Sequence, residues 1–427
     1  FSFAKLRGSI ARVGNDAGFD RLINSYSYGG LFRNDMAWFQ GDAVRKNPNL
    51  KPETTISKEI GAEVRLLDGR LTADVTYYDK YTCDQIVESE LSYLSNYQRV
   101  IINSGKISNK GWEISVSGVP VKVKNFEWKT IFNWSKNNSM VESLPEGIDK
   151  IQIGSGVYNV KSYAEVGKPY GAIYAKTFKR DAEGYILCQL DGSPKEGQDY
   201  EYLGCVQADW RGGWNNVFRL GNFSFSVMFD FQKGGKFFSQ TSIQSSVDGQ
   251  SVKSLEGRDA DFFSRKILGE SDEERYGFMR PQNANTPTAN GQIYPDWGRP
   301  KGVVLPNCRY DEDVEGLAGQ QVLGYCTPER YWMHYTSRDI SRFIYDASYV
   351  KLREITVSYD LPKKWLRKTP FQTFRVAAVG RNIATLFANT PHGLDPQATS
   401  TTGNAQGFER GFNLPSATYG FDIKVSF

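Results

Sequence analysis

The residue types that most often perform catalysis or bind metals are scarce in this sequence. It has only two histidines, His334 in the aromatic segment YWMHY and His392 in the turn-rich segment NTPHGLDPQ. A Ser-His-Asp triad or a His-containing zinc site would need one of them. The cysteines have no CxxC spacing, and the acidic segments 180–184 and 190–193 lack the alternating carboxylates of a calcium loop. We therefore expect no catalytic site, no metal site and no cofactor, and we interpret the acidic segments as hairpin tips.

The cysteines admit a structural role. There are five, an odd number, so at least one lacks a partner within this chain. Cys188 with Cys205, and Cys308 with Cys326, lie in loop-like sequence and could form disulfides outside the cell. Partly buried thiols are the alternative interpretation for each pair.

Charge and hydropathy exclude several classes of protein. The net charge is +4 with acids and bases interspersed, whereas a nucleic-acid-binding surface needs clustered Lys and Arg. No run of about 18 apolar residues occurs, which excludes membrane-spanning helices. Aromatic residues make up 14%, yet the mean hydropathy is only -0.49. Both values suit a transmembrane barrel, because each strand exposes only every second side chain to lipid.

Period-two strand patterns recur along the whole chain. The first clear hairpin joins 57–66 to 70–78 through Leu67, Asp68 and Gly69, and Asp-Gly favours a type I′ turn. A second joins strands near 112–117 and 126–135 through a turn near 120–125. A third runs from 209–220 through Gly221-Asn222 to 223–232. Their alternating positions are apolar on one face and polar on the other, with Ile131 as an exception.

Long connections separate these hairpins. They cover 14–55, 88–110, 137–170 and above all 234–345. Short turns at one end and long loops at the other are typical of outer-membrane barrels. A soluble β-sandwich is the alternative, but it rarely tolerates a loop on the order of a hundred residues. No linker divides the chain, so we expect residues 1–427 to form one architecture.

The final segment is an amphipathic strand. Its apolar face carries Tyr419, Phe421, Ile423, Val425 and Phe427. On a soluble protein such a strand would be an exposed, aggregation-prone edge, and closure of a barrel removes that edge. A terminal Phe also resembles the assembly signal of bacterial outer-membrane proteins. The first residues have the pattern of a strand interior and not that of a signal peptide, so we expect further chain upstream.

Several segments resemble SusC-like (RagA-type) TonB-dependent outer-membrane transporters of Bacteroidota. The matching stretches, in the family's order, are NPNLKPETTISKEIGAEVRLLDGRLTADVTYYDK, INSGKISNKGWEISVSGVPV, DWRGGWNNVFRLGNFSFSVMFDFQKGG, YDASYVKLREITVSYDLPKKWL, GRNIATLFANTPHGLDPQ and LPSATYGFDIKVSF. Within YDASYVKLREITVSYD the apolar parity changes, which predicts a β-bulge near 353–354.

The resemblance implies an all-β fold, a transmembrane antiparallel β-barrel with long extracellular loops and short periplasmic turns. This chain would supply roughly a dozen strands, the C-terminal half of a plugged barrel of about 22 strands. The plug, the TonB box and any N-terminal domain would lie in the absent N-terminal half. The implied function is TonB-dependent uptake of oligosaccharides or peptides with a SusD-like surface lipoprotein. The other partners are TonB, the N-terminal half and outer-membrane lipid. A passive porin or structural barrel is the alternative, followed by a barrel enzyme or adhesin.

Candidate ligand or partner contacts lie in the loop region 234–345. Sugars present apolar ring faces rimmed by hydroxyl groups, and protein interfaces favour Arg, Tyr and Trp. The residues with this chemistry are Tyr294, Asp296, Trp297, Arg299, Tyr310, Tyr331, Trp332 and His334. The alternative is that these aromatic side chains fold the loop on itself.

Overall fold

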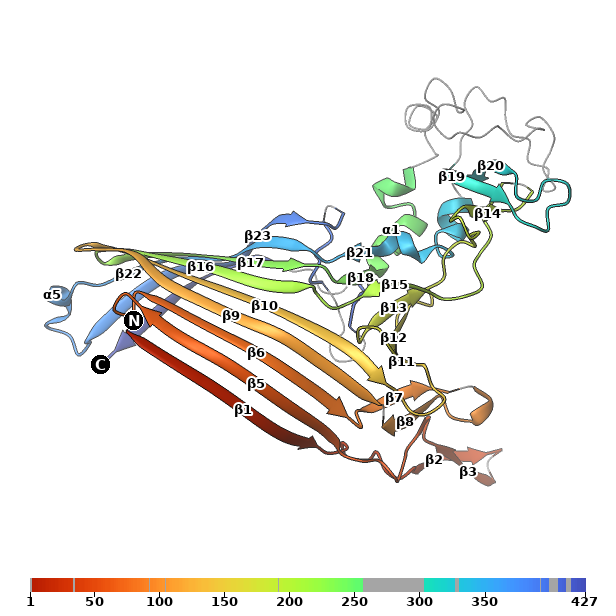
Figure 1. Cartoon of the computed structure of the whole chain (residues 1–427), viewed down its shortest axis with the longest axis horizontal. Helices are drawn as coiled ribbons and strands as arrows, with labels where there is room; N and C mark the ends of the chain where they lie inside the picture. Colours follow the sequence, from red (N-terminus) through yellow and green to blue (C-terminus); the bar gives the residue numbers. More distant parts are fainter. Residues whose placement is uncertain are drawn as a thin grey trace, which may run out of the picture.

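A single antiparallel sheet of ten strands dominates the computed structural model (Figure 1). The structure describes residues 2–427 except 34, 92, 104, 191, 256–302, 327–329, 392, 399–405 and 412–415. In spatial order the strands are β1 (Phe3–Asn15), β5 (Glu53–Leu66), β6 (Leu71–Cys83), β9 (Lys106–Val123), β10 (Phe126–Ser143), β16 (Trp210–Leu220), β17 (Phe223–Lys233), β22 (Tyr349–Asp360), β23 (Thr373–Ala388) and β25 (Thr418–Ser426). We call this sheet the wall. Its β1 and β25 edges are not joined, and its ten strands are fewer than the dozen expected.

The three predicted hairpins are confirmed, and their turns gather at one end of the wall. Arg70 donates to the Leu67 carbonyl at 3.0 Å, while Asp68 and Gly69 have φ of 53° and 81°, the positive values that a type I′ turn requires. Gly221 and Asn222 form a two-residue turn between β16 and β17. The second turn is shorter than predicted, because β9 continues to Val123. A short helix α5 (Lys363–Leu366) joins β22 to β23 at this short-turn end (Figure 1).

Register divides the wall into two faces. Partners across the sheet place Asp74, Ser115, Asn133, Gly213 and Asp230 in one lateral row. The adjacent row, on the opposite face, consists of Ala73, Val116, Phe132, Trp214 and Phe229. Because side chains alternate along each strand, the first row belongs to a polar face and the second to an apolar face.

The apolar face is widely exposed. Leu6 is 84% exposed, Ile10 80% and Phe421 86%. A contiguous apolar surface of this extent marks contact with a membrane or a partner. The last strand, β25, pairs with β23 along its length, as the sequence predicts, and the Phe427 ring lies 5.3 Å from that of Phe371.

A β-bulge lies where the parity of β22 changes. Met228 and Phe229 on β17 face Glu354 and Leu352, so Arg353 has no counterpart in the register. The pairing of β22 with β23 shifts at the same place. The bulge predicted near 353–354 is therefore confirmed, and it brings Arg353 and Glu354 toward the polar face together.

The long connections at the opposite end fold into smaller sheets. Near the first strands these are the hairpin β2 (Tyr26–Phe32) and β3 (Met36–Gly41), and a sheet of β4 (Val44–Arg45), β7 (Ile86–Glu90) and β8 (Arg99–Asn103), with the 3-10 turn η1 (Tyr93–Ser95) between β7 and β8. The others form what we call the loop module, residues 150–205, 236–255, 303–346 and 408–409.

The loop module contains three sheets and several short helices. Its strands are β11 (Lys150–Ser155), β12 (Lys161–Glu165), β13 (Ala172–Ala175) and β15 (Glu201–Cys205) in one sheet, β14 (Ile186–Cys188), β19 (Val303–Tyr310) and β20 (Gln321–Cys326) in a second, and β18 (Lys236–Ser239), β21 (Ile344–Asp346) and β24 (Phe408–Glu409) in a third. Its helices are α1 (Gln240–Val247), the 3-10 helices η2 (Val252–Leu255) and η4 (Ile340–Phe343), and the π-helix η3 (Tyr331–Tyr335). No helix among the described residues is long and apolar enough to cross a membrane.

Buried side chains concentrate in the loop module. One cluster joins Phe178, Ile186 and Val303 to Tyr331 and Trp332. Another joins Ile173 of β13 to Phe238 of β18, Phe343 of η4 and Phe408 of β24. In each cluster, segments more than a hundred residues apart in sequence share a core, so the long loops pack against one another.

Candidate functional site

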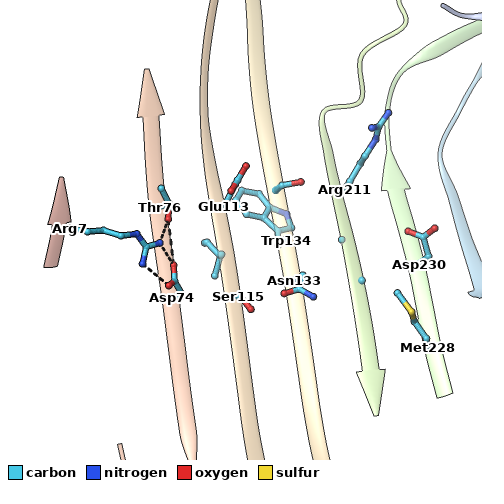
Figure 2. A pocket seen from close by; sticks show the side chains of 14 residues that line it. Arg7, Asp74, Thr76, Glu113, Ser115, Asn133, Trp134, Arg211, Met228 and Asp230 are labelled. Carbon is cyan, nitrogen blue, oxygen red and sulfur yellow. Dashed lines mark hydrogen bonds and ion pairs between the residues drawn. The ribbon is translucent and has the colours of Figure 1, made fainter. Parts of the chain in front are cut away.

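A cavity of about 590 Å³ lies on the polar face of the wall (Figure 2). It crosses β1, β6, β9, β10, β16 and β17, so it is assembled from segments spread over more than two hundred residues. Its polar lining residues are Arg7, Asp74, Thr76, Glu113, Ser115, Asn133, Ser135, Arg211 and Asp230. Charged and hydroxyl side chains in a shared cavity can bind a polar solute.

On one side of the cavity, an arginine and an aspartate form a bidentate ion pair. Arg7 donates through Nη1 and Nη2 to the two Asp74 carboxylate oxygens, at 2.7 and 2.5 Å, and Nη2 also donates to the Thr76 hydroxyl. Arg7 and Asp74 are on β1 and β6, so the guanidinium must cross the intervening strand β5. It does so at Gly61, where a Cβ atom would lie only 2.7 Å from Arg7 Nε. Gly61 therefore makes the bidentate pair possible.

The other side of the cavity carries a second neutralised charge. Asp230 accepts hydrogen bonds from Arg353 of the bulge, at 3.1 Å from Nε, and from the Tyr349 hydroxyl at 3.2 Å. Arg353 also donates to Gln397 Oε1 at 2.6 Å. The bulge thus contributes to the site, because it directs the Arg353 guanidinium toward the Asp230 carboxylate on the neighbouring strand.

A buried lysine attaches the segment after β23 to the wall. Lys351 is 1% exposed, and its Nζ donates to both Asp395 carboxylate oxygens at 2.6 Å and to Gln397 at 3.0 Å. A buried charge is tolerated only when it is paired and hydrogen-bonded in this way. A second cavity, of about 340 Å³, lies between this segment and the wall and shares Arg211 and Asp230 with the first.

Two charges in the first cavity have no counter-charge. Arg211 donates through Nε to Gln232 Oε1 at 2.9 Å, but forms no ion pair with the residues that the structure describes. Glu113 is exposed and has neither an ion pair nor a side-chain hydrogen bond within the same described ranges. Dashed contacts in Figure 2 join Arg7 to Asp74 and Thr76, and none reaches Glu113 or Arg211.

Ion pairs in the loop module serve packing. Asp311 is 3% exposed and accepts from Lys195 at 2.7 Å and Lys179 at 2.9 Å. Burial alone would raise the pKa of Asp311, but the hydrogen bonds from the two lysines outweigh it and hold that pKa at about 2. Arg309 pairs with Asp181 at 2.9 Å in the same manner. These contacts join the 179–195 hairpin to the 309–313 segment.

The structure describes some of the predicted loop contacts and not others. Tyr294, Asp296, Trp297 and Arg299 lie outside the described residues. Tyr310, Tyr331 and Trp332 are 6%, 1% and 1% exposed and belong to a core cluster, and they stay predicted contacts. Their burial favours the alternative, in which these rings fold the loop on itself. His334 is exposed on η3.

Neither predicted disulfide is present. In the structure Cys188 is not bonded to Cys205, and Cys308 is not bonded to Cys326. Cys188 and Cys205 lie on β14 and β15, which belong to different sheets. In the β19–β20 hairpin Cys308 faces Val322 and Cys326 faces Val303, so the two cysteines are offset along the strands. Within the described ranges no three His, Cys, Asp or Glu side chains gather as a possible metal site.

The sequence prediction does not include the cavity residues, because its candidate contacts all lie in the loop region 234–345. A usable signal exists, however. Glu113, Arg211 and Asp230 are charged residues at polar-face positions inside strands whose other face is rich in aromatic residues. Strand interiors that carry charge on one parity predict a wall lining a polar interior. What the pattern omits is which strands are neighbours.

The fold and this site define the class of protein: part of an antiparallel β-barrel whose wall has an exposed apolar face and a charged polar face. The TonB dependent receptor-like, beta-barrel family matches residues 3–383, and the chain belongs to this family. It is 25% identical over 395 residues to TonB-dependent receptor P3 of Formosa agariphila, covering 87% of this chain and 33% of that protein. TonB-dependent receptor SusC of Bacteroides thetaiotaomicron is 29% identical over 104 residues, which are 24% of this chain and 10% of SusC.

A solved structure confirms the fold. The chain described as "Structure of the RagAB peptide transporter" superposes with a TM-score of 0.64 at 16% identity, covering 99% of this chain and 41% of that chain. The protein in a "closed-closed" state of the RagAB peptide importer gives the same TM-score at 17% identity. The present chain therefore spans about a third of receptor P3 and two fifths of the solved transporter. The fold prediction of a TonB-dependent β-barrel is confirmed.

Proposed function

We propose that this chain is the C-terminal barrel portion of an outer-membrane nutrient importer of the SusC-like class, which takes up oligosaccharides or peptides under TonB drive. The observation that carries the proposal is the division of the wall into two faces. Phe132 and Trp214 are exposed on the apolar face, while the next lateral row supplies Asn133 and Asp230 to a cavity. A membrane barrel needs this arrangement, because lipid contacts one face and a polar lumen the other.

Localisation follows from the same division. The apolar face would contact outer-membrane lipid, with the short-turn end in the periplasm and the loop module outside the cell. The β1 and β25 edges would pair with strands of the N-terminal half, because an unpaired edge exposes backbone donors and acceptors to lipid. The plug and the TonB-contacting segment would belong to that half.

The loop module is the proposed docking site of a SusD-like lipoprotein. Its support is a packed body at the long-loop end, with cores around Trp332 and Phe238 that keep its surface in a fixed shape. Tyr294, Asp296, Trp297 and Arg299 remain predicted contacts with this partner or with substrate. The similar solved structure is described as a peptide transporter, which supports peptides, and oligosaccharides stay within the proposal as the other class that the sequence resemblance implies.

Transport, and not catalysis, is the proposed activity. The polar groups in the cavity are mostly tied to one another, as Arg7 is to Asp74 and Arg353 to Asp230. A catalytic base or nucleophile needs to be free to react in a substrate complex. Paired charges of this kind instead give a rigid polar wall.

The test uses the full-length transporter in its native cell. The gene is deleted, and growth is measured on oligosaccharide or peptide mixtures as the sole nutrient, with and without TonB. Importer function predicts that complementation restores growth on one class of nutrient only when TonB is present. Capture of the transporter should also recover a surface lipoprotein. Uptake that persists without TonB would contradict the proposal and favour the passive porin.

A further inference from the structure

A row of aromatic and basic side chains crosses the apolar face of the wall at its long-loop end, beside the loop module (Figure 1). Through the register the row runs over β6, β9, β10, β16 and β17, and its members are Tyr77, Trp112, Lys136, Trp210 and Lys233. All five have the parity of the apolar side chains on their own strands. We call this row the outer girdle.

The outer girdle has the composition of a boundary between hydrocarbon and lipid headgroups. Trp112 is 47% exposed, and its ring centroid lies 5.0 Å from that of Tyr77. Exposed aromatic side chains in a row across a barrel wall mark this boundary. A lysine at the same level can lay its methylene stem along the apolar surface and extend its ammonium group among the headgroups. The girdle therefore places two ammonium groups at headgroup level.

The two lysines of the girdle are open to a ligand. Lys136 and Lys233 are exposed, and neither forms an ion pair or a side-chain hydrogen bond with a residue that the structure describes. Their strands, β10 and β17, lie in the middle of the ten-stranded wall, away from the β1 and β25 edges. Both lysines have outward parity, so a plug in the lumen and strands added at the edges would leave them accessible.

A cavity of about 740 Å³ is lined by both lysines. It forms because β10 extends beyond the start of β16: the last pair between these strands is Ser135 with Arg211, and residues 136–140 of β10 line the cavity beyond it. The remaining lining comes mainly from the segment that leads into β16 and from the end of β17, with Trp210 between the two lysines. A headgroup can thus enter the wall at the level of the girdle.

The other charges of this cavity are neutralised or belong to the opposite face. Lys236 and Asp346 pair with one another, at 3.5 Å between Nζ and Oδ2. The Asp209 carboxylate lies against Gly234, where a Cβ atom would be 2.6 Å from it, and both residues have the parity of the polar face. Among the described residues, the outward side of the cavity therefore has two lysines and no unpaired acid.

We propose that Lys136 and Lys233 bind a phosphate group of a glycolipid in the outer leaflet, with its acyl chains lying along the apolar face beside Phe132. A phosphate monoester carries about 1.5 to 2 negative charges near neutral pH and three acceptor oxygens. Lysine binds such a group as a point charge, and basic pockets at a membrane surface recognise anionic headgroups in this way. The inference rests on the proposed orientation, with the long-loop end outside the cell. It goes beyond import, because the ligand is a lipid on the outer surface and not a solute in the lumen.

The test is lipid binding by the full-length transporter, purified in a neutral detergent, freed of native lipid and titrated under native mass spectrometry. The probes are lipid A with two phosphates, the same lipid A after dephosphorylation, and the phosphorylated disaccharide without acyl chains. Wild-type protein should bind the phosphorylated lipid A most tightly. Lys136→Gln and Lys233→Gln should each weaken that binding about fivefold, and the double variant about 25-fold.

Two controls separate charge at the girdle from other effects. Replacing both girdle lysines by arginine retains the charge, so Lys136→Arg with Lys233→Arg should keep the preference for phosphorylated lipid A. Lys363→Gln with Lys364→Gln removes two exposed lysines at the short-turn end and should bind lipid A as the wild type does. Heat-modifiable mobility on gels verifies that each variant has assembled.

Equal binding of phosphorylated and dephosphorylated lipid A would overturn the inference, because contact with the apolar face would then be sufficient. Wild-type affinity in the double Gln variant would also overturn it. If the disaccharide without acyl chains bound as tightly as lipid A, the ligand would be a soluble phosphate and the lipid assignment would be wrong. These outcomes are separate from the import function, which TonB-dependent growth tests.

Discussion

The wall and the loop module use apolar residues in opposite ways. In the wall, large apolar side chains such as Leu6 and Phe421 are 84% and 86% exposed. In the loop module, Trp332 and Phe238 are each 1% exposed. Of the buried clusters among the described residues, two lie in the module, and a small third one joins Ile107 of β9 and Val141 of β10 in the wall to Ala164 of β12. In the wall, large apolar side chains therefore point outward, where a membrane would contact them. In the loop module, the same residue types pack against each other.

The two regions are stabilised by different interactions. Wall strands depend on backbone pairing, on aromatic neighbours such as Phe223 and Tyr359 at 4.6 Å, and on what covers the apolar face. The module depends on hydrophobic burial between segments distant in sequence. Away from the small cluster that Ile107, Val141 and Ala164 share, substitutions should thus act independently in the two regions.

The largest effect is expected from truncating the module's core. Trp332→Ala removes a fully buried indole and should cost about 3–5 kcal/mol. Hydrogen exchange in peptides from 303–346 should become much faster, while exchange in β5, β6 and β9 should stay unchanged. The control is Trp365→Ala, because Trp365 is 60% exposed on α5 and should cost little. Faster exchange throughout the wall in Trp332→Ala would contradict the separation.

A charge on the apolar face of the wall should have the next largest effect. Phe132→Lys places a charge where lipid is expected and should cost about 2–4 kcal/mol, lowering the yield of heat-modifiable, membrane-assembled barrel. The neighbouring Ile131 is also apolar, but its register partners Ser117 and Asn215 place it on the polar face. Ile131→Lys should assemble normally. Equal defects in the two variants would show that the faces are wrongly assigned.

A smaller, pH-dependent effect is expected at Asp311. Its pKa of about 2 lies below the ordinary value near 3.8, so its stabilisation is present above about pH 4 and lost as the pH falls toward 2. The shift corresponds to about 2 kcal/mol. Asp311→Asn should destabilise the module at pH 6, and the difference from wild type should vanish near pH 2, measured by denaturant unfolding of the module. Asp313→Asn is the control, because the Asp313 side chain is 68% exposed. A difference that persists at pH 2 would contradict the ion-pair explanation.

The smallest effect is expected from reducing agent. A disulfide closing a loop typically contributes about 2–4 kcal/mol, so its reduction would be easy to detect. Without disulfides, denaturant unfolding of the module should be the same with and without reductant. Burial also raises the pKa of the Cys205 thiol, although backbone hydrogen bonds oppose the rise, so its alkylation near pH 7 should be slow. A reductant-dependent transition would restore the predicted pairs.

Prediction from sequence succeeded where structure is local. The Asp68-Gly69 turn, the Gly221-Asn222 turn and the change of parity at Arg353 are each decided by a few adjacent residues. Period two then assigns most side chains to a face. Ile131 shows the limit, because its own polarity disagrees with its position and only the register resolves it.

The rest depends on contacts that no local pattern contains. Phe178 and Trp332 share a core although 154 residues separate them, so the aromatic side chains of the long loop could not be recognised as buried. The cavity needs six strands in a particular order, and Arg7 reaches Asp74 only because Gly61 lies between them. Solvation and register, more than residue type, decided which aromatic and charged residues were available to a ligand.

The most direct test of the two-faced wall is a spin-label scan along β10 in the full-length protein reconstituted in lipid bilayers. Single labels are placed at 127–135 in a background without native cysteines, and collision with oxygen is compared with collision with a water-soluble nickel reagent. Lipid contact on one face predicts that oxygen access is high at Phe132 and Trp134 and that nickel access is high at Asn133 and Ser135, with period two. Equal access at neighbouring positions, or high nickel access at Phe132, would contradict the membrane barrel.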